Sequence, residues 1–351
     1  MTTADGAAAR YVHRKAVYDL VVDGQSISAT VNPRLESLTL TEKRGADADE
    51  LELVLKDHDF NLAIPPAGAL ITLKLGWLDL REGATPQLVD KGSFKVDERC
   101  WSGTPDILTI RAKSADLTRA FRSRRSQTWS DTTLGAVLGE IAGRNALTPV
   151  VASSMASIVV NHLTQGRESD SALLARLGRE YDALATVKAE KLLFAPVGAG
   201  ETAGGQPIPP VTITRRAGDG CRWESAEREN YSGVTVAWHD RGSARRREIT
   251  VGSSNNPKKL GKTYASERAA RRAAETHQSK QKRKVAKFSI NLAAGDPALF
   301  PERKVTVQGF KPQIDGTEWL IVETNHRLDG AGGLRTSLQM ELGGSATPAT
   351  P

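Results

Sequence analysis

The chain has 351 residues, of which 39% are hydrophobic and 25% charged, and it carries a formal net charge of +7 at pH 7. This length supports two or three domains with cores of their own, and the composition is ordinary for a soluble globular protein. No apolar run approaches the roughly 20 residues of a membrane helix, and the N-terminus lacks the apolar segment of a signal peptide. The two cysteines, Cys100 and Cys221, exclude a disulfide framework. We therefore expect an intracellular protein with reduced thiols and no membrane partner.

Basic residues gather in three segments, 119–125, 241–247 and 268–287. Such a segment can bind the phosphates of a nucleic acid, face the solvent or contact an acidic partner. No helix-turn-helix, zinc-finger or aromatic RNA-binding pattern accompanies the charges. We expect the positive charge to help the protein dock into a multi-subunit assembly. We rank the alternative, a DNA-binding regulator, below this interpretation.

Residues 1–10 are rich in Ala and Thr and are expected to be disordered. Residues 11–115 then read as one strand after another. In 49–56, for example, Leu51, Leu53 and Leu55 alternate with charged residues, which is typical of a strand with one buried face. The predicted strands are 17–22, 35–42, 49–56, 70–77, 88–98 and 107–112. We expect them to form a small, closed or nearly closed antiparallel β-barrel.

In residues 116–230 the pattern changes from successive strands to helices and short strands, which predicts an α+β middle domain. Ser130-Asp131 is a candidate cap for a helix with Leu134, Val137, Leu138 and Ile141 on one face. A second helix is predicted after Ser169-Asp170. Short strands are predicted at 158–160, 185–188 and 191–195. The Gly- and Pro-rich stretch 196–210 is expected to be a flexible loop.

Residues 231–342 predict a second small antiparallel barrel with one helix. Its predicted strands are 232–239, 246–251, 287–292, 304–307, 318–326 and 334–342. The helix is predicted at 266–282, where alanines form a stripe suited to close packing on a sheet. Strands near 234–238 and 318–322 are expected to be open edges that neighbouring subunits complete. The tail, 343–351, is expected to be disordered.

The motifs of common enzymes are missing from the sequence. It has no phosphate-binding P-loop, no G-x-G-x-x-G after a strand, no G-x-S-x-G and no H-E-x-x-H. His326 is expected to be a half-buried imidazole at the end of a strand, hydrogen-bonded to nearby backbone. We predict no catalytic residue, cofactor or metal site, and hence no enzyme.

Two groups of residues resemble a known family. The first is a hairpin followed by a Gly-rich turn and a further strand, made of Gly316, Trp319, Ile321, Thr324, His326, Gly332, Gly333, Thr336 and Leu338. The second starts a helix upstream and comprises Gln165, Glu168, Ser169 and Asp170. In this order they resemble the late-control D proteins, the tail hubs of contractile-tailed phages, which are kin to the N-terminal half of VgrG spikes of type VI secretion. The resemblance covers about residues 12–342.

The resemblance implies a mainly-β fold in which two small antiparallel β-barrels flank the α+β domain. It further implies a homotrimer whose six barrels form a ring between the sixfold tail tube and the trimeric central spike. Tape-measure and baseplate wedge proteins would be further partners, and DNA would pass through the central channel. Such a hub is assembled in the host bacterial cytoplasm and ends in the virion tail baseplate.

Arg245, Arg246 and Arg247 are the residues that we expect to line the channel or contact a partner. The alternative within the same fold is the hub of a type VI-like secretion spike. Because the sequence ends without a neck or a β-needle, we expect a phage tail or a tail-derived particle.

Overall fold

The structure is a computed structural model and describes residues 14–343, apart from 46–47, 82, 115–118, 189, 203, 226–230, 241 and 331–332. The expectations for residues 1–10 and 344–351 lie outside the described residues, as does Gly332.

The N-terminal part forms a six-stranded antiparallel unit in the order β3-β4-β7-β6-β5-β1. Alternate residues of each strand enter its core, as the leucines of β4 show by being buried at Leu51, Leu53 and Leu55. The strands are β1 (Arg14–Val22), β3 (Leu35–Lys43), β4 (Glu50–Lys56), β5 (Leu70–Asp79), β6 (Gln87–Ser102) and β7 (Ile107–Ser114). Three short elements, β2 (Gln25–Ser26), α1 (Ser28–Val31) and the 3-10 turn Asn32–Arg34, connect β1 to β3.

The C-terminal part forms a second unit in the order β14-β18-β21-β20, with β19 beside β20 and β13 parallel to β19. Its core is centred on Trp319, which is fully buried. The elements are β13 (Val211–Thr214), the 3-10 turn Arg215–Ala217, β14 (Gly218–Ser225), β18 (Ala286–Leu292), β19 (Lys304–Gln308), α7 (Pro312–Asp315), β20 (Glu318–Asp329) and β21 (Gly333–Leu342).

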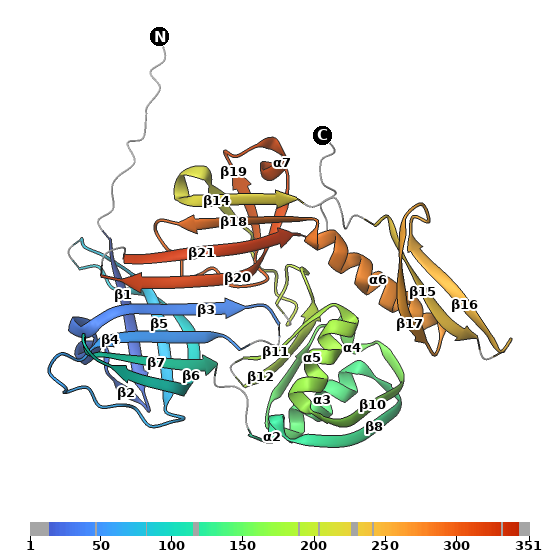
Figure 1. The fold of residues 1–351 in the computed structure, drawn as a ribbon, viewed down its shortest axis with the longest axis horizontal. Coiled ribbons are helices and arrows are strands. Elements are labelled where there is room, and N and C mark those ends of the chain that lie inside the picture. Colours follow the sequence, from blue (N-terminus) through green and yellow to red (C-terminus); the bar gives the residue numbers. More distant parts are fainter. Residues whose placement is uncertain are drawn as a thin grey trace, which may run out of the picture.

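The two units share one 13-stranded sheet, because β20 pairs with β3 (Figure 1). The antiparallel register runs from Glu323 opposite Lys43 to Asp329 opposite Ser37. The prediction of a mainly-β fold is confirmed, but neither unit closes into a barrel. The alternation of apolar residues predicts which face of a strand is buried, yet it does not specify which strand lies beside it. Here an edge of each unit is used to pair with the other unit.

The middle segment is α+β, as predicted. The helices α3 and α5 pack their leucines into one core with two small sheets, β8-β10 and β11-β12-β9. Its elements are α2 (Arg119–Arg122), β8 (Arg124–Thr133), α3 (Leu134–Arg144), β9 (Thr148–Val151), α4 (Ser153–Ala156), β10 (Val159–Ser169), α5 (Asp170–Tyr181), β11 (Ala183–Lys188) and β12 (Lys191–Pro196). The cap of α3 is Thr133, whose Oγ1 accepts a hydrogen bond from the Ala136 amide, whereas the predicted Ser130-Asp131 lies within β8.

A third sheet, in the order β16-β15-β17, stands apart from the large one at the far right of Figure 1. Its strands are β15 (Gly233–Asp240), β16 (Arg245–Gly252) and β17 (Pro257–Tyr264), and α6 (Glu267–Lys284) packs on it. Ala270 and Ala274 of α6 contact Val234 and Val236, so the small side chains permit the predicted close approach. The prediction that these strands belong to the second barrel is wrong. The domain boundaries themselves remain predictions.

The predicted open edges are also wrong. β15 lies between β16 and β17, and β20 is paired along both sides. Free edges are instead left by β14 and by most of β1, at the two ends of the large sheet, and by β16 and β17. Both misassigned strands are apolar because they are interior, and a run of apolar residues does not distinguish an interior strand from an edge that awaits a partner.

Candidate assembly surfaces

The upstream motif surrounds the start of α5 and is a buried polar network. The Asp170 carboxylate is fully buried and receives hydrogen bonds from Arg144 (2.6 Å, Nη2 to Oδ1), Gln165 (2.8 Å) and Asn145 (2.8 Å). A carboxylate in the first turn also faces the positive end of the helix dipole. The network fixes α3, β10 and α5 relative to one another.

The other two motif residues lie at the edge of this network. Ser169 is the N-cap of α5 and accepts a hydrogen bond from the Ala172 amide. Glu168 pairs with Arg176 one turn into the helix, at 2.5 Å. All four residues of the motif therefore organise the middle segment.

The downstream motif lies in the second unit. Gly316 ends the single turn α7, and the Trp319 indole donates a hydrogen bond to the Ile314 carbonyl of that turn (3.1 Å). The Phe288 ring packs against the indole at 5.4 Å between centroids. These residues hold α7 against the hairpin.

His326 occupies the middle of β20 and is 0% exposed, so the prediction of a half-buried residue at a strand end is wrong. Its Nδ1 lies 2.8 Å from the Thr336 hydroxyl, whose oxygen accepts a bond from the Asp296 amide and whose proton is free to be donated to the ring. Its Nε2 faces two acceptors, the Leu299 carbonyl (3.3 Å) and Glu42 Oε2 (3.2 Å). These partners assign the neutral Nε2–H tautomer.

No pattern in the sequence indicates the Glu42 carboxylate, because it comes from β3, across the junction of the two units. It also accepts from Lys91 (2.7 Å) and from the Thr324 hydroxyl (3.1 Å). Burial opposes its charge, but His326 and Lys91 outweigh it and lower the pKa of Glu42 to about 2. Burial lowers the pKa of His326, which keeps the ring neutral. The cluster therefore stabilises the β3–β20 junction and contains one buried ion pair, Glu42 with Lys91.

A second ionic cluster joins the large sheet to the middle segment. Arg44 pairs with Glu302 and Glu341, and Arg283 of α6 pairs with the same Glu341 (3.1 Å) and with Asp182 (2.5 Å). Burial raises the pKa of Glu302 even though Arg44 acts against it. The five residues are spread over almost the whole chain and have no spacing in common, which is why sequence patterns miss them.

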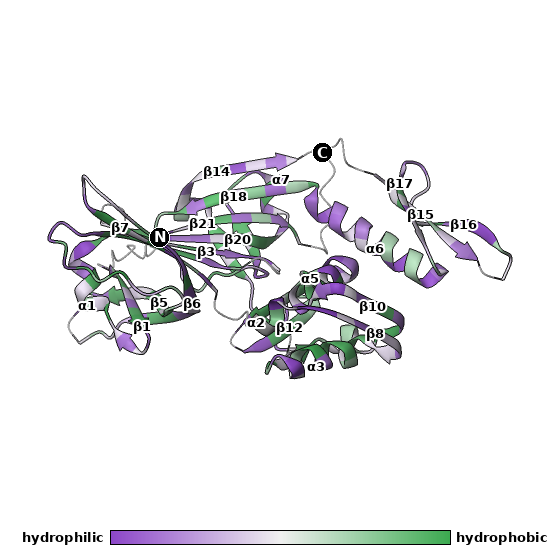
Figure 2. Ribbon diagram, turned by 60° about the horizontal axis from the view of Figure 1, so that its bottom comes forward, coloured by the Kyte–Doolittle hydropathy of each residue, from purple (hydrophilic) through white to green (hydrophobic). Residues whose placement is uncertain are grey.

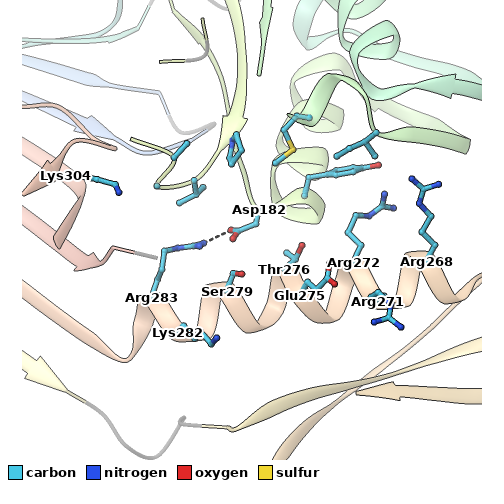
Figure 3. Close-up of a pocket in the computed structure, with 17 residues that line it drawn as sticks. Asp182, Arg268, Arg271, Arg272, Glu275, Thr276, Ser279, Lys282, Arg283 and Lys304 are labelled. Carbon is cyan, nitrogen blue, oxygen red and sulfur yellow. Dashed lines mark hydrogen bonds and ion pairs between the residues drawn. The ribbon is translucent and has the colours of Figure 1, made fainter. Parts of the chain in front are cut away.

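A cleft of 780 Å³ opens between α6 and the middle segment (Figure 3). One wall is α6, which Figure 2 draws as largely hydrophilic, and the other includes Met155, Ile158 and Tyr181. The Arg272 guanidinium lies over the Tyr181 ring, 4.3 Å from its centroid. The Arg283–Asp182 ion pair crosses the cleft in Figure 3.

The predicted basic residues Arg245, Arg246 and Arg247 lie on β16, an outer strand of the third sheet, and are exposed. Arg247 pairs with Asp240 at 2.9 Å. They do not share the cleft with the arginines of α6.

Among the described residues, no group of three or more His, Cys, Asp or Glu side chains is arranged to hold a metal ion. Cys100 and Cys221 are both free thiols. No helix in the described part of the chain is long and apolar enough to span a membrane.

Comparison with known proteins identifies the fold. A family model described as the phage tail baseplate hub matches residues 50–331. A probable baseplate hub protein of Escherichia phage 186 is 39% identical over 364 residues, which cover 92% of this chain and 92% of that protein. The 43 kDa tail protein of prophage MuSo2 from Shewanella oneidensis aligns with a TM-score of 0.66 and 16% identity, over 95% of this chain and 99% of that one.

An Escherichia coli component of the type VI secretion system aligns with a TM-score of 0.55 and 12% identity, over 95% of this chain and 79% of that one. The architecture is therefore that of phage tail proteins and of the related secretion components. The chain belongs to the phage tail baseplate hub family, and the resemblance seen in the sequence is confirmed. It is a structural component of the tail baseplate.

Proposed function

We propose that three copies of the chain form a ring that joins the sixfold tail tube to the trimeric central spike. The observation that carries this proposal is the presence of two mainly antiparallel units in one chain, β1–β7 and β13–β21 without β15–β17. The β3–β20 junction places them side by side. Three copies of a chain with two such units present six comparable surfaces. A closed ring needs head-to-tail contacts, which a threefold axis supplies.

The sheet ends offer places for these contacts. β14 forms one end of the large sheet, and most of β1 is unpaired on the side away from β5 at the other end. Backbone groups at such edges are ready to pair with another chain. We propose that the second unit of one copy docks by this route beside the first unit of the next.

The remaining partners follow from the position of a hub. The tail tube and the tape-measure protein would lie on the sixfold side, the spike on the threefold side, and the baseplate wedge proteins at the periphery. The chain would be assembled in the cytoplasm of the host bacterium, and it would act without catalysis, cofactor or membrane.

Arg245, Arg246 and Arg247 are proposed to contact a partner protein or the DNA that passes through the channel. Their exposure on an outer strand and their positive charge support a contact with an acidic surface. Particles that carry all three as Gln should assemble or eject DNA less efficiently. If assembly and ejection are both unchanged, this role is excluded.

The mass of the purified chain in solution, alone and mixed with the cognate spike protein, tests the ring. We expect a trimer, or a monomer that trimerises when the spike is added. A chain that stays monomeric with the spike but shifts on duplex DNA would overturn the proposal and favour a DNA-binding regulator.

A further inference from the structure

The cleft along α6 has one positively charged wall and one apolar wall. Six Arg and Lys side chains and two carboxylates line it. Of the six, Arg283 is neutralised by Asp182 and Glu341, and Lys304 is paired with Glu318 at 3.0 Å. Arg271 has only an exposed pair with Glu267 one turn earlier, a contact of little energy.

The Arg268 and Lys282 side chains form no hydrogen bond or ion pair with any residue that the structure describes. Both are exposed. In Figure 3 Arg268 stands at one end of the α6 wall, and Lys282 lies near the other end, beside Arg283 and on the lower side of the helix. Between them Arg272 is held over Tyr181, which presents its guanidinium to the cleft. The wall thus carries a row of cations that the described part of the chain leaves without carboxylate partners.

The opposite wall supplies the apolar contacts. Met155, Ile158, Tyr181 and Val197 line it and are only partly buried. Polar contacts at the C-terminal end of α5, from Thr276 to the Glu180 carbonyl (3.2 Å) and from Lys280 to the Arg179 carbonyl, join α6 to the middle segment. They hold the two walls at a fixed separation, so the cleft exists before anything binds.

We propose that this cleft binds an extended, acidic segment of a partner protein in which carboxylates alternate with apolar side chains. The distance from Arg268 to Arg283 along the helix is about 22 Å at 1.5 Å per residue, which accommodates about seven residues of extended chain. In an extended segment, alternate side chains point to opposite sides, so one set faces the cations of α6 and the other the apolar wall.

A nucleic acid fits the cleft less well. The Tyr181 ring, the aromatic side chain of the lining, is already covered by Arg272 and offers no face for a base to stack on. The inference rests on the cleft alone and holds whether or not the chain forms a ring.

The test uses the full chain and a fluorescein-labelled peptide, Glu-Leu-Glu-Phe-Glu-Leu-Glu, with binding followed by fluorescence anisotropy. We expect saturable binding that weakens as salt rises. The double variant Arg268→Glu, Lys282→Glu should bind at least about tenfold more weakly, which corresponds to about 1.4 kcal/mol. Both side chains are exposed and unpaired within the described residues, so the fold should survive, as checked by circular dichroism and melting.

The matched control is Arg216→Glu, Lys311→Glu, which changes the net charge equally at two exposed side chains outside the cleft lining. It should bind within about twofold of the wild type. The proposal is overturned if both double variants weaken binding alike, or if a peptide with Ser in place of the apolar residues binds as tightly. It is also overturned if an oligothymidylate displaces the peptide at lower concentration than unlabelled peptide does, or if no saturable binding is seen.

Discussion

At the scale of single residues, the junction of the two units depends on Glu42, which sits between His326 and Lys91. Lys91 is 3% exposed, so its ammonium group relies on that carboxylate. Removing one partner of a buried ion pair leaves an uncompensated charge in the interior. Of this cluster the sequence motif includes His326, Thr324 and Thr336 but not Glu42 or Lys91, which lie far away along the chain.

We expect Glu42→Gln to lower the free energy of unfolding by about 3–5 kcal/mol, because Lys91 would remain buried without its counter-ion. The matched control is Glu36→Gln, which removes the exposed pair with Lys56 (2.7 Å). That change should cost less than about 1 kcal/mol. Urea denaturation of both variants measures the difference, and equal effects would contradict the assignment of the buried pair.

The same cluster predicts how stability changes with pH. Burial lowers the pKa of His326 below 6.5, so the unfolded chain takes up a proton before the folded one does. The free energy of unfolding should therefore fall as the pH drops below about 6.5. The Glu42 contribution, present above its ordinary pKa of 4.5, should be lost as the pH approaches about 2.

Urea denaturation at pH 7, 6 and 5 tests the histidine part. In His326→Gln the decline of stability between pH 7 and 5 should be shallower than in the wild type. The exposed His58 serves as the control, and His58→Gln should keep the wild-type slope. A slope that is the same in all three proteins would mean that His326 does not titrate differently in the folded chain.

At the scale of elements, the helices of the middle segment differ in how closely they approach their neighbours. A Cβ on Gly178 of α5 would lie 2.8 Å from the Ala185 Cβ and 3.1 Å from the Ala183 carbonyl of β11. A Cβ on Gly139 of α3 would meet no atom within 4 Å. The same substitution should therefore have opposite effects at the two positions.

We expect Gly178→Ala to destabilise the protein by about 1–3 kcal/mol, because the helix must shift from β11. Gly139→Ala should instead stabilise it by about 0.5–1 kcal/mol, since Ala loses less conformational entropy in a helix. Thermal melting of the two variants distinguishes them. If both move the melting temperature in the same direction, the close packing of α5 on β11 is not as described.

The elements themselves follow largely from local patterns. The leucines of β4, α3 and α5 occur at spacings of two or of three and four, and these elements form where predicted. What the patterns do not contain is the pairing between elements. The predicted strands do not include β8, β9, β13, β14 or β17. They place β15 and β16 in the wrong sheet, because pairing is decided by contacts between distant segments.

At the scale of the whole molecule, the continuous sheet makes the two units one cooperative body. Amide hydrogens that lie in the β3–β20 pairing, residues 37–43 and 323–329, should exchange as slowly as those of β21. Amides on the free edge of β14 should exchange faster. Hydrogen exchange followed by mass spectrometry measures this, and rapid exchange in both β3 and β20 would mean that the units separate in solution.

The central claim is that three chains with two units each build a ring with six comparable surfaces. Averaged electron micrographs of the isolated hub, viewed along its axis, test it most directly. We expect true threefold symmetry with six lobes of similar size around a central channel. A twofold or fourfold particle, or a threefold one with only three lobes, would contradict the claim.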